Sequence, residues 1–523
     1  MKIETLSKKI PLSINPYDAF GLLSNNGQEP NTALLETAEA GTHANQKSIV
    51  MSSAAAKISC FDRIVKVTAY NQNGQGIIKN IIESKLFSHY HLDEAVQELS
   101  ITIDTQEENI NEYQKLISPS SFDVLRVVQS LIGSHNTEED QTSCLIGTIG
   151  FDCVDQFEDL PVVNKVDEDY CFYVADEMLI QDFTTKTAKI VVKGFDENAD
   201  NIIHLGVKLE KIEQKLSRIQ MHQSYQSQEN KSFQVDIDEK QFALLINKAK
   251  QHILEGDIFQ VVLARTFTTP CQSAYAAYGA LRESNPSPYM YYINFSDKEL
   301  FGASPESALK ISATRQVSLY PIAGTRKRAV DANDYKNIDY DKDSRIEFEL
   351  INDQKESAEH MMLVDLARND LAKVVKSQTR FISQLKQVVK YSHVMHMVSE
   401  VKGTLLDSID ALHAYRACAN MGTLTGAPKI KAMQIIRQQE QKPRGLYGGA
   451  VCLFNAAGEF DSAIIIRSAV VRDKVATVTA GAGIVYDSQV QLEVNETQHK
   501  AQAVLNACHY KNKQNDNNKE CAA

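Results

Sequence analysis

Three β-rich segments near the carboxyl end are joined by very short connections. Residues 448–485 read GGAVCLFNAAGEFDSAIIIRSAVVRDKVATVTAGAGIV, and only NAAGEF and RDK separate the apolar runs. Parallel strands need a crossover of about a dozen residues or more, whereas antiparallel strands close through tight turns. The stretch therefore predicts three strands in an antiparallel meander.

Helical and β patterns occupy separate runs elsewhere in the chain. Residues 170–183 and 186–195 read as a strand pair around TTKT, and residues 202–219 have helical spacing of apolar side chains. Another helix is expected to open with Pro428 in its first turn, where a missing N–H costs nothing. The segment NETQHKAQAVLNACHY predicts an amphipathic helix whose apolar side holds Ala501, Val504, Leu505 and Cys508. Segregated strands and helices favour an α+β fold over alternating βαβ units.

A chain of 523 residues is too long for one core, so two domains are expected. The polar stretch 220–234, QMHQSYQSQENKSFQ, has few apolar residues and is the candidate linker. It would separate an N-terminal domain, 1–219, from a second domain, 235–510. The polar end, 511–523, is expected to be a disordered tail.

Charge and cysteine usage narrow the classes of function. The formal net charge is −12, which does not favour nucleic acid or an anionic membrane as a partner. Nine cysteines without a C-x-x-C pair are typical of reduced thiols in a cytoplasmic protein. Neither a signal-peptide core nor an apolar run of about 18 residues is found in the sequence.

Two carboxylate pairs stand out. Glu356 and Glu359 are three residues apart in a helical stretch, and Glu493 and Glu496 repeat that spacing ahead of the last helix. Four carboxylates around one cavity would repel unless a hard cation such as Mg²⁺ lay between them. The alternative is four solvated surface charges, which is the more common situation for glutamate. Lys500, one turn after Glu496, would either pair with it or point into the same cavity.

Other candidates also have two interpretations. His396, in YSHVMHMVSEV, is either a core histidine or a catalyst, and Thr325 after Gly324 either turns the chain or contacts a ligand. Arg467 interrupts the centre of a predicted strand, and a buried arginine needs either a structural carboxylate or a ligand's carboxylate. Gly481 and Gly483 either let a ligand approach the backbone or form a bulge.

Several familiar catalytic motifs are absent from the sequence. It contains no H-E-x-x-H, G-x-S-x-G, Walker loop or strand-linked G-x-G-x-x-G. No cysteine lies in a glycine-rich nucleophile elbow, which argues against a built-in glutaminase.

Seven further segments occur in a characteristic order: PIAGTRKR, KESAEHMMLVDLARNDL, YSHVMHMVS, MGTLTGAPKIKAM, GLYGGAV, IIIRSAVV and AGAGIVYDSQVQLEVNETQHKA. With NTALLETAEA, GTIGFDCVDQFEDLP and SNPSPYMYY, they give the chain a close resemblance to the large subunits of anthranilate synthases, within the chorismate-utilising enzymes. The resemblance covers nearly the whole length. It implies a layered antiparallel β-sheet core flanked by helices, with an interleaved N-terminal regulatory domain.

The resemblance also implies an active site. Glu359 and Glu496 would hold Mg²⁺, with Glu356 and Glu493 as supporting acids. Glu306 would be the general acid for a departing hydroxyl, and His396 would transfer a proton or orient the substrate. The expected substrate contacts are Gly324, Thr325, Tyr447, Arg467, Gly481, Ala482, Gly483 and Lys500. Departures from the family pattern are GTRKRA for the common GTRPRG and LLET for LLES.

Two positions separate related reactions. Aminodeoxychorismate synthases carry a lysine where this chain has Ala323, and isochorismate-type enzymes carry one where it has Gln260. Both absences favour ammonia as the nucleophile and anthranilate as the product. A catalytically dead tryptophan sensor is the rival, but all the expected acids, His396 and Arg467 are present.

The resemblance finally implies control and assembly. Residues in NTALLETAEA and SNPSPYMYY would bind tryptophan as a feedback inhibitor; by itself each stretch could equally be a strand packed on a proline-rich turn. The expected inhibitor contacts are Glu36, Thr37, Pro288, Tyr289 and Met290. A separate glutamine amidotransferase would supply ammonia, in a heterotetramer of two large and two small subunits.

Overall fold

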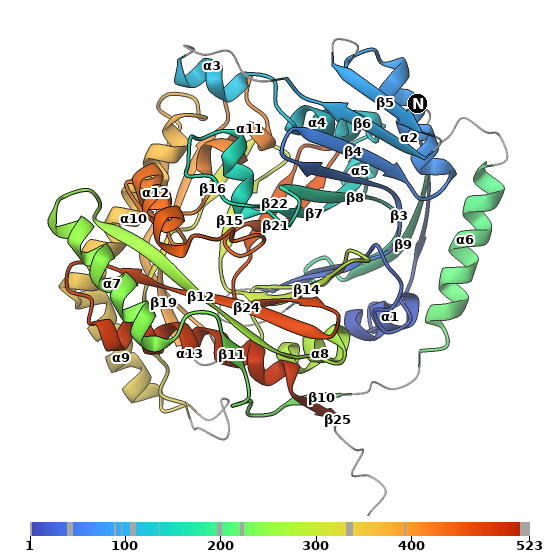
Figure 1. Ribbon diagram of the computed structural model, residues 1–523. Helices are drawn as coiled ribbons and strands as arrows, with labels where there is room; N and C mark the ends of the chain where they lie inside the picture. Colours follow the sequence, from blue (N-terminus) through green and yellow to red (C-terminus); the bar gives the residue numbers. More distant parts are fainter. Residues whose placement is uncertain are drawn as a thin grey trace, which may run out of the picture.

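The computed structural model describes residues 3–38, 45–87, 90–95, 97–104, 111–134, 136–195, 201–219, 224–330, 338–391 and 394–512. It confirms an α+β fold in which antiparallel strands form the centre and helices lie around them (Figure 1). The helices are α1 (Pro16–Leu23), α2 (Gln72–Glu83), α3 (Glu112–Ile117), α4 (Phe122–Leu131), α5 (Thr137–Asp140), the 3₁₀ helix η1 (Phe151–Gln156), α6 (Asn201–Leu216), α7 (Glu239–Leu254), α8 (Ala274–Ser284), α9 (Tyr340–Asn352), α10 (Gln354–Ala372), α11 (Ala411–Cys418), α12 (Lys429–Glu440) and α13 (Val490–Cys508).

One branch of the strand network combines the two ends of the chain. Its hydrogen-bonded order is β3 (Asn45–Phe61), β2 (Thr32–Ala38), β13 (Tyr289–Asn294), β14 (Glu299–Ser304), β23 (Ser468–Arg472), β24 (Val475–Ile484), β12 (Gln260–Pro270) and β11 (Gln234–Val235). The two-residue strand β20 (Gly426–Ala427) also pairs with β12.

The second branch starts from β8 (Tyr170–Asp182), which pairs with β3 along most of its length. Its order continues through β7 (Cys144–Ile149), β21 (Ala450–Asn455), β22 (Phe460–Ile464), β15 (Ser307–Ile311), β16 (Gln316–Leu319) and β19 (Val394–Thr404), which also pairs with β17 (Ile322–Lys327) and β18 (Phe381–Lys390). In Figure 1, strands β7, β15, β16, β21 and β22 of this branch lie above β12, β14 and β24.

Smaller strand groups complete the molecule. Strands β1 (Glu4–Lys9) and β9 (Thr187–Gly194) extend the sheet beyond β8, and β4 (Ile64–Ala69), β6 (Glu98–Thr102) and β5 (His91–Ala95) extend it beyond β3. The predicted strand pair around TTKT is confirmed as β8 and β9.

The chain crosses between the two branches at two adjacent points. Between β14 and β15 it passes through Glu306, and between β22 and β23 it passes through Arg467. The crossings are hydrogen-bonded to the strands beside them, from Ala303 N to the Arg467 carbonyl at 3.1 Å and from Ile464 N to the Glu306 carbonyl at 3.0 Å. Two predicted site residues are thus brought together because both lie where the strands change layers.

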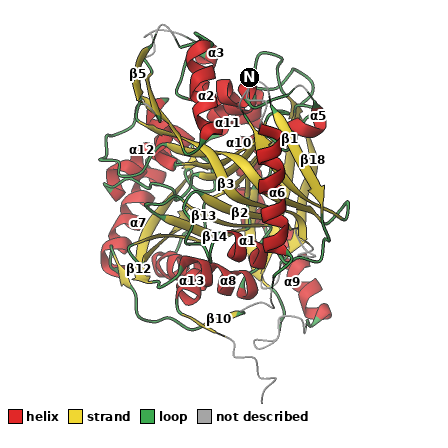
Figure 2. Ribbon diagram, turned by 90° about the vertical axis from the view of Figure 1, so that its right-hand side faces the viewer, coloured by secondary structure: helices red, strands yellow, loops and turns green. Residues whose placement is uncertain are grey.

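Helices cover the outer faces through apolar stripes. The predicted apolar residues of α13, Ala501, Val504, Leu505 and Cys508, are all buried against α8 and the sheet. Helix α6 packs Leu205, Leu209 and Ile212 on β9, and it faces the viewer in Figure 2. Helix α13 also packs directly on β24, so its side chains keep a fixed position relative to the β24 backbone.

Three expectations about local structure differ from the structure. The predicted three-strand meander contains four strands, because the run IIIR breaks at residues 465–467, where Arg467 has φ of 52° and the chain changes layers. The predicted linker contains the short strands β10 (Tyr225–Ser227) and β11, and β10 pairs with β25 (Tyr510–Asn512). Strand β25 extends into the predicted tail, while residues 220–223 and 513–523 lie outside the described part.

Within the described residues, no helix is both long and apolar enough to cross a membrane.

Candidate active site

Helix α10 carries the first carboxylate pair on its first two turns. The Asp353 side chain caps it by accepting hydrogen bonds from the backbone N–H groups of Lys355 and Glu356. Glu356 accepts a hydrogen bond from Arg326 at 2.7 Å, whereas the nearest cation to Glu359 is Lys355 at 3.8 Å. Burial raises the pKa of Glu359, and repulsion from Glu356, Asp353 and Asp487 adds to that rise. Glu359 is therefore a carboxylate with a surplus of negative charge around it.

Helix α13 carries the second pair. Burial raises the pKa of Glu493 to about 6, and the charge of Glu496 contributes in the same direction. Lys500 lies 2.5 Å from Glu496 and also donates a hydrogen bond to the Gly481 carbonyl at 2.9 Å. Lys500 therefore pairs with Glu496, which is one of the two predicted alternatives, and it also contacts the β24 backbone.

The donor set of these two helices fits a hard cation. Oxygen ligands from carboxylates are those that Mg²⁺ prefers, and a cation would relieve the repulsion that raises the pKa of Glu359 and Glu493. Asp487, just before α13, acts on Glu359, so the beginnings of the two helices lie near each other. In the described part, the only three-residue group whose ligand atoms lie within 4.8 Å of one another is elsewhere, at His252, Glu255 and Asp257.

Glu306 lies buried at its crossing, with 8% of its surface exposed. Thr423 donates a hydrogen bond to Glu306 Oε1 at 2.9 Å. Burial raises the pKa of Glu306 to about 8, although Thr423 and the charge of Lys500 both oppose the rise. The carboxyl group is consequently protonated at neutral pH and able to donate a proton.

His396 lies on β19 opposite Thr325 on β17, with its Nδ1 2.9 Å from the Thr325 hydroxyl. Desolvation lowers the pKa of His396 to about 4, and the charges of Arg467 and Lys500 contribute. The imidazole is thus neutral at pH 7. Gly324, just before Thr325, lies at a bulge in β17 with φ of 81°, a conformation that favours glycine, and an added Cβ would lie 3.3 Å from Glu356 Oε2.

Arg467 donates a hydrogen bond to the Lys500 carbonyl at 3.0 Å. Within the described residues, no carboxylate lies within 4 Å of its guanidinium, so the structural-carboxylate alternative is not met there. Desolvation lowers the pKa of Arg467, and Glu496 and Tyr447 oppose this. The guanidinium remains available for an anion.

Gly481, Ala482 and Gly483 belong to β24 and pair with β12. Side chains alternate across a strand, and Ala482 packs into the core on the helix side, so the substrate would meet the backbone and not its methyl group. A Cβ on Gly481 would lie 2.7 Å from the hydroxyl of Tyr447, which places Tyr447 against this strand. Gln260 pairs with Ala427, and its side-chain amide lies on the Gly483 side.

The predicted inhibitor residues come together on strands β2 and β13. Thr37 pairs with Tyr289 and Glu36 with Met290, while the Pro288 carbonyl accepts a hydrogen bond from Ala38 N. Because side chains alternate across strands, Thr37 and Tyr289 lie on one face and Glu36 and Met290 on the other.

The environments of the two faces differ. Tyr289 donates a hydrogen bond to Asp461 at 3.1 Å, and Thr37 to the Lys47 carbonyl at 3.4 Å. Buried Glu36 instead accepts hydrogen bonds from Arg282 at 2.7 Å and Tyr278 at 2.6 Å. Its carboxylate is therefore occupied in this structure by side chains of α8.

Sequence patterns did not identify several neighbours of the site. Thr423, Asp487, Arg282 and Tyr278 come from distant parts of the chain, and no spacing links them to their partners. Thr423 lies within MGTLTGAPKIKAM, one of the segments that carry the family resemblance, and this was the one sign in the sequence that it belongs to the site.

Comparison with known proteins identifies the family. The family model for chorismate binding enzymes matches residues 86–506. Anthranilate synthase component 1 of Vibrio cholerae is 43% identical over 513 residues, which cover 97% of each chain. The chain belongs to the anthranilate synthase component 1 family.

Other relatives agree with this membership. The component 1 protein of Escherichia coli is 40% identical, with 94% of each chain covered. The crystal structure of anthranilate synthase component I from Streptococcus pneumoniae has a TM-score of 0.67 at 26% identity and covers 88% of this chain and 92% of its own. The Escherichia coli isochorismate synthase MenF, at 17% identity and a TM-score of 0.68, shares the fold over 97% of this chain and 95% of its own.

Proposed function

We propose that the chain converts chorismate and ammonia into anthranilate, pyruvate and water, as the first committed step of tryptophan biosynthesis in the cytoplasm. The observation that carries this proposal is the buried Glu306, which accepts a hydrogen bond from Thr423 in a site that also contains His396, Arg467 and Lys500. Chorismate is a dicarboxylate, so two cations beside a proton donor match its chemistry.

The reaction needs a proton donor for the departing C4 hydroxyl and a binding site for the carboxylate of the enolpyruvyl group. Ammonia adds at C2 of the ring, and the C4 hydroxyl leaves as water with the proton that Glu306 donates. Arg467, Tyr447 and the β24 backbone from Gly481 to Gly483 would bind the enolpyruvyl side, and Gly324 and Thr325 would contact the ring. Neutral His396, oriented by Thr325, would serve proton transfer as pyruvate is eliminated and the ring becomes aromatic.

Mg²⁺ is the proposed cofactor. Glu359 and Glu496 would hold it, with Glu356 and Glu493 in support. Bound there, it would supply charge neutralisation for the substrate's ring carboxylate. Lys500 also contacts Glu496. Because Mg²⁺ would take over that carboxylate, the Lys500 ammonium group could turn toward Gly481 and the substrate.

The choice of product rests on two side chains that lack an amine. Ala323 cannot act as a nucleophile, and the Gln260 amide cannot act as a base. Water or an enzyme amine would therefore not replace ammonia in the attack. A catalytically dead tryptophan sensor would not need a proton donor. Buried Glu306, close to the cations Arg467 and Lys500, therefore favours a catalyst.

The proposed partner is a glutamine amidotransferase, since the relatives are named as component 1 of a synthase. The proposed assembly is a heterotetramer of two large and two small subunits. Tryptophan is the proposed feedback inhibitor.

Product analysis tests the proposal directly. The purified chain is incubated with chorismate, Mg²⁺ and ammonium at raised pH, and the products are followed by anthranilate fluorescence and chromatography. We expect anthranilate and pyruvate in equal amounts, and no reaction with glutamine alone. Aminodeoxychorismate or isochorismate as the main product, or no turnover at all, would refute it.

A further inference from the structure

The aromatic ring of Tyr391 packs against the imidazole of His396. Tyr391 follows β18, and its backbone N–H donates a hydrogen bond to the Val394 carbonyl at 2.8 Å, which continues the β18–β19 ladder beyond Lys390. Tyr391 and His396 are therefore diagonal neighbours across the two strands, within reach of each other's rings. The ring centres lie 5.2 Å apart and the planes are inclined at 66°, an edge-to-face arrangement. This contact supports the imidazole from the β18 side.

Thr325 holds the same imidazole from the opposite side. Strands β17 and β18 lie on the two edges of β19, and the Thr325 hydroxyl of β17 lies 2.9 Å from His396 Nδ1. One hydrogen bond constrains one edge of the ring, and the χ2 torsion of histidine is a broad one. Packing of Tyr391 from the other strand therefore limits the tilt that the hydrogen bond alone would allow.

Tyr391 is itself held firmly. Its side chain is 6% exposed, and Arg328 Nη1 donates a hydrogen bond to the Tyr391 carbonyl at 2.9 Å. Arg328 is fixed in turn by the buried carboxylate of Asp343 on α9, at 2.8 Å. A functional side chain is positioned well only when its supporting residues are locked by their own contacts. The ion pair below Tyr391 meets that condition.

The phenol end of Tyr391 lies near the other proposed proton-transfer group. Burial raises the pKa of Tyr391 to about 12, and an ionised Glu306 adds to that rise. Tyr391 therefore contacts His396 with its ring and lies within electrostatic reach of Glu306. It is the first residue of the segment YSHVMHMVS, in which His396 alone has a role in the proposed reaction.

We propose that Tyr391 is a positioning residue of the active site, whose ring holds the His396 imidazole against Thr325 in the orientation for proton transfer. This inference rests on the proposed function, because it assigns proton transfer to His396. The effect comes from the ring and does not require the phenol hydroxyl. A misplacement of about 1 Å at a reacting group can cost on the order of 10²-fold in rate, so a packing contact of this kind has a measurable effect on turnover.

Four variants test the proposal. Tyr391→Leu and Tyr391→Met remove the aromatic ring and keep an apolar side chain, whereas Tyr391→Phe keeps the ring and removes the hydroxyl. Tyr225→Leu is the matched control, because Tyr225 of β10 packs edge to face on Tyr510 at 5.4 Å. Steady-state kcat and chorismate KM are measured with Mg²⁺ and ammonium, together with Tm.

A second measurement follows His396 without turnover. Histidine labelled with ¹³C at Cε1 reports the titration of each imidazole, and the His396 signal is the one missing from His396→Asn. Desolvation lowers the pKa of His396, and the charges of Arg467 and Lys500 contribute. Those two charges are unchanged in the variants. Loss of the Tyr391 ring admits water to the imidazole, so the titration midpoint of His396 should move to higher pH.

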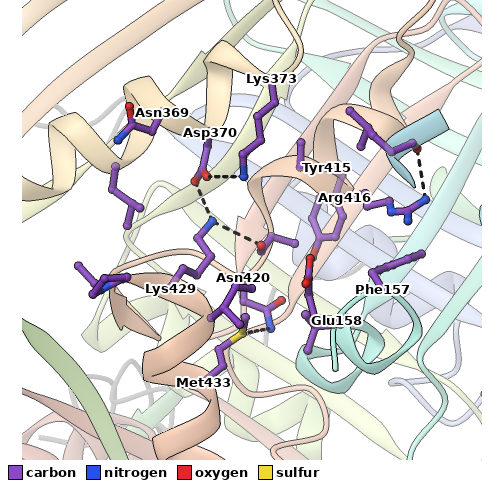
Figure 3. A pocket seen from close by; sticks show the side chains of 18 of the residues that line it. Phe157, Glu158, Asn369, Asp370, Lys373, Tyr415, Arg416, Asn420, Lys429 and Met433 are labelled. Atoms are coloured by element: carbon purple, nitrogen blue, oxygen red, sulfur yellow. Dashed lines mark hydrogen bonds and ion pairs between the residues drawn. The ribbon is translucent and has the colours of Figure 1, made fainter. Parts of the chain in front are cut away.

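The assays isolate the active site from the largest cavity in the described part of the chain. That cavity, of about 1140 Å³, lies between α3, η1, α10, α11 and the start of α12 (Figure 3). Neither Tyr391 nor His396 lines it. Changes in ammonium-dependent turnover in the Tyr391 variants therefore report on the surroundings of His396.

For Tyr391→Leu and Tyr391→Met we expect kcat to fall about 10- to 100-fold with little change in chorismate KM, and the His396 midpoint to rise. Tyr391→Phe should rescue most of the lost kcat and restore the parental midpoint. Tyr225→Leu should lower Tm without lowering kcat.

Parental kcat and a parental His396 midpoint in the Leu and Met variants would overturn the proposal. Equal losses in Tyr391→Phe and Tyr391→Leu would also overturn it, because the hydroxyl would then carry the effect. A rise in chorismate KM at constant kcat would overturn it as well, since Tyr391 would then act on substrate binding. Failure of the parent to convert chorismate with ammonium would instead refute the proposed function, and the labelled histidine would still show whether the ring holds His396.

Discussion

The hydroxyl of Thr423 donates a hydrogen bond to Glu306 Oε1 at 2.9 Å, and this contact joins residues 117 positions apart. It opposes the burial that raises the pKa of Glu306 to about 8. In the proposed reaction, the proton would therefore come from a carboxyl group whose pKa depends on a residue in another part of the chain.

Removing that hydrogen bond should change the pH profile. Turnover is expected to decline as pH rises through about 8 in the parent, because Glu306 then loses its proton. In Thr423→Val the decline should move to higher pH, since the bond stabilises the charged form. Steady-state kcat with ammonium, measured from pH 6 to 10 and corrected for free ammonia, checks this. An unchanged or downward-shifted decline would contradict it.

Glu306→Gln should separate catalysis from stability. Turnover should fall roughly 10²- to 10⁴-fold, the usual contribution of a positioned acid. The folded-state pKa lies above the unfolded value of about 4.3, so ionising Glu306 costs the parent stability as pH rises from about 4 to 8. The introduced amide cannot ionise, and the variant should therefore have a higher Tm than the parent at pH 8.5 but not at pH 4. Calorimetry at both pH values measures this.

The metal assignment is tested on the two helices. Glu359→Gln and Glu496→Gln should abolish Mg²⁺ binding in isothermal titration and abolish turnover, with the circular dichroism spectrum unchanged. Glu83→Gln is a matched control, because Lys79 and Glu83 form an i, i+4 pair at 3.7 Å, close to the 3.8 Å of Lys355 and Glu359. Full Mg²⁺ affinity in either active-site variant would assign the metal elsewhere.

Two glycines of β24 should respond differently to alanine. A methyl group on Gly481 would lie 2.7 Å from the Tyr447 hydroxyl and 3.0 Å from the Leu263 carbonyl, so Gly481→Ala must displace the substrate-side tyrosine. On Gly483 the nearest atom is the Gln260 amide at 3.4 Å, an ordinary contact. We expect the chorismate KM to rise at least tenfold in Gly481→Ala and to change little in Gly483→Ala. Equal effects would mean that Tyr447 does not position the substrate.

The two faces of β2 and β13 lead to different predictions for tryptophan inhibition. Thr37→Val should leave Tm unchanged and raise the inhibitory tryptophan concentration about tenfold, within the 1–3 kcal/mol range typical of allosteric coupling.

Glu36→Gln should instead lower the free energy of unfolding by roughly 3 kcal/mol, because it leaves Arg282 partly uncompensated in a buried pair. Met290→Thr, also buried, should lower both stability and sensitivity. Thermal melts and inhibition curves distinguish these outcomes, and parental inhibition of Thr37→Val would remove that face from the inhibitor site.

Helices and strands with a regular spacing of apolar residues were predictable from the sequence. Contacts between residues far apart in the chain were not. The apolar spacing of NETQHKAQAVLNACHY predicted a helix, and α13 confirms it, although the helix begins earlier, at Val490, and includes Glu493. The strand break at Arg467 could not be predicted, because IIIR has uniform β propensity and only the change of layer gives Arg467 a positive φ. The occupation of Glu36 by Arg282 was equally hidden, since 246 residues separate them.

The pairing of early strands with late ones also governs how this chain is made. Strand β7 reaches its β21 partner only after some 300 further residues have been synthesised, and β2 waits for β13 in the same way. A ribosome elongating at about 5–20 residues per second would thus leave the apolar edge of β7 open for at least 15 seconds. Until then these strand edges are open to pairing with other chains, so aggregation during translation is the hazard that this topology creates.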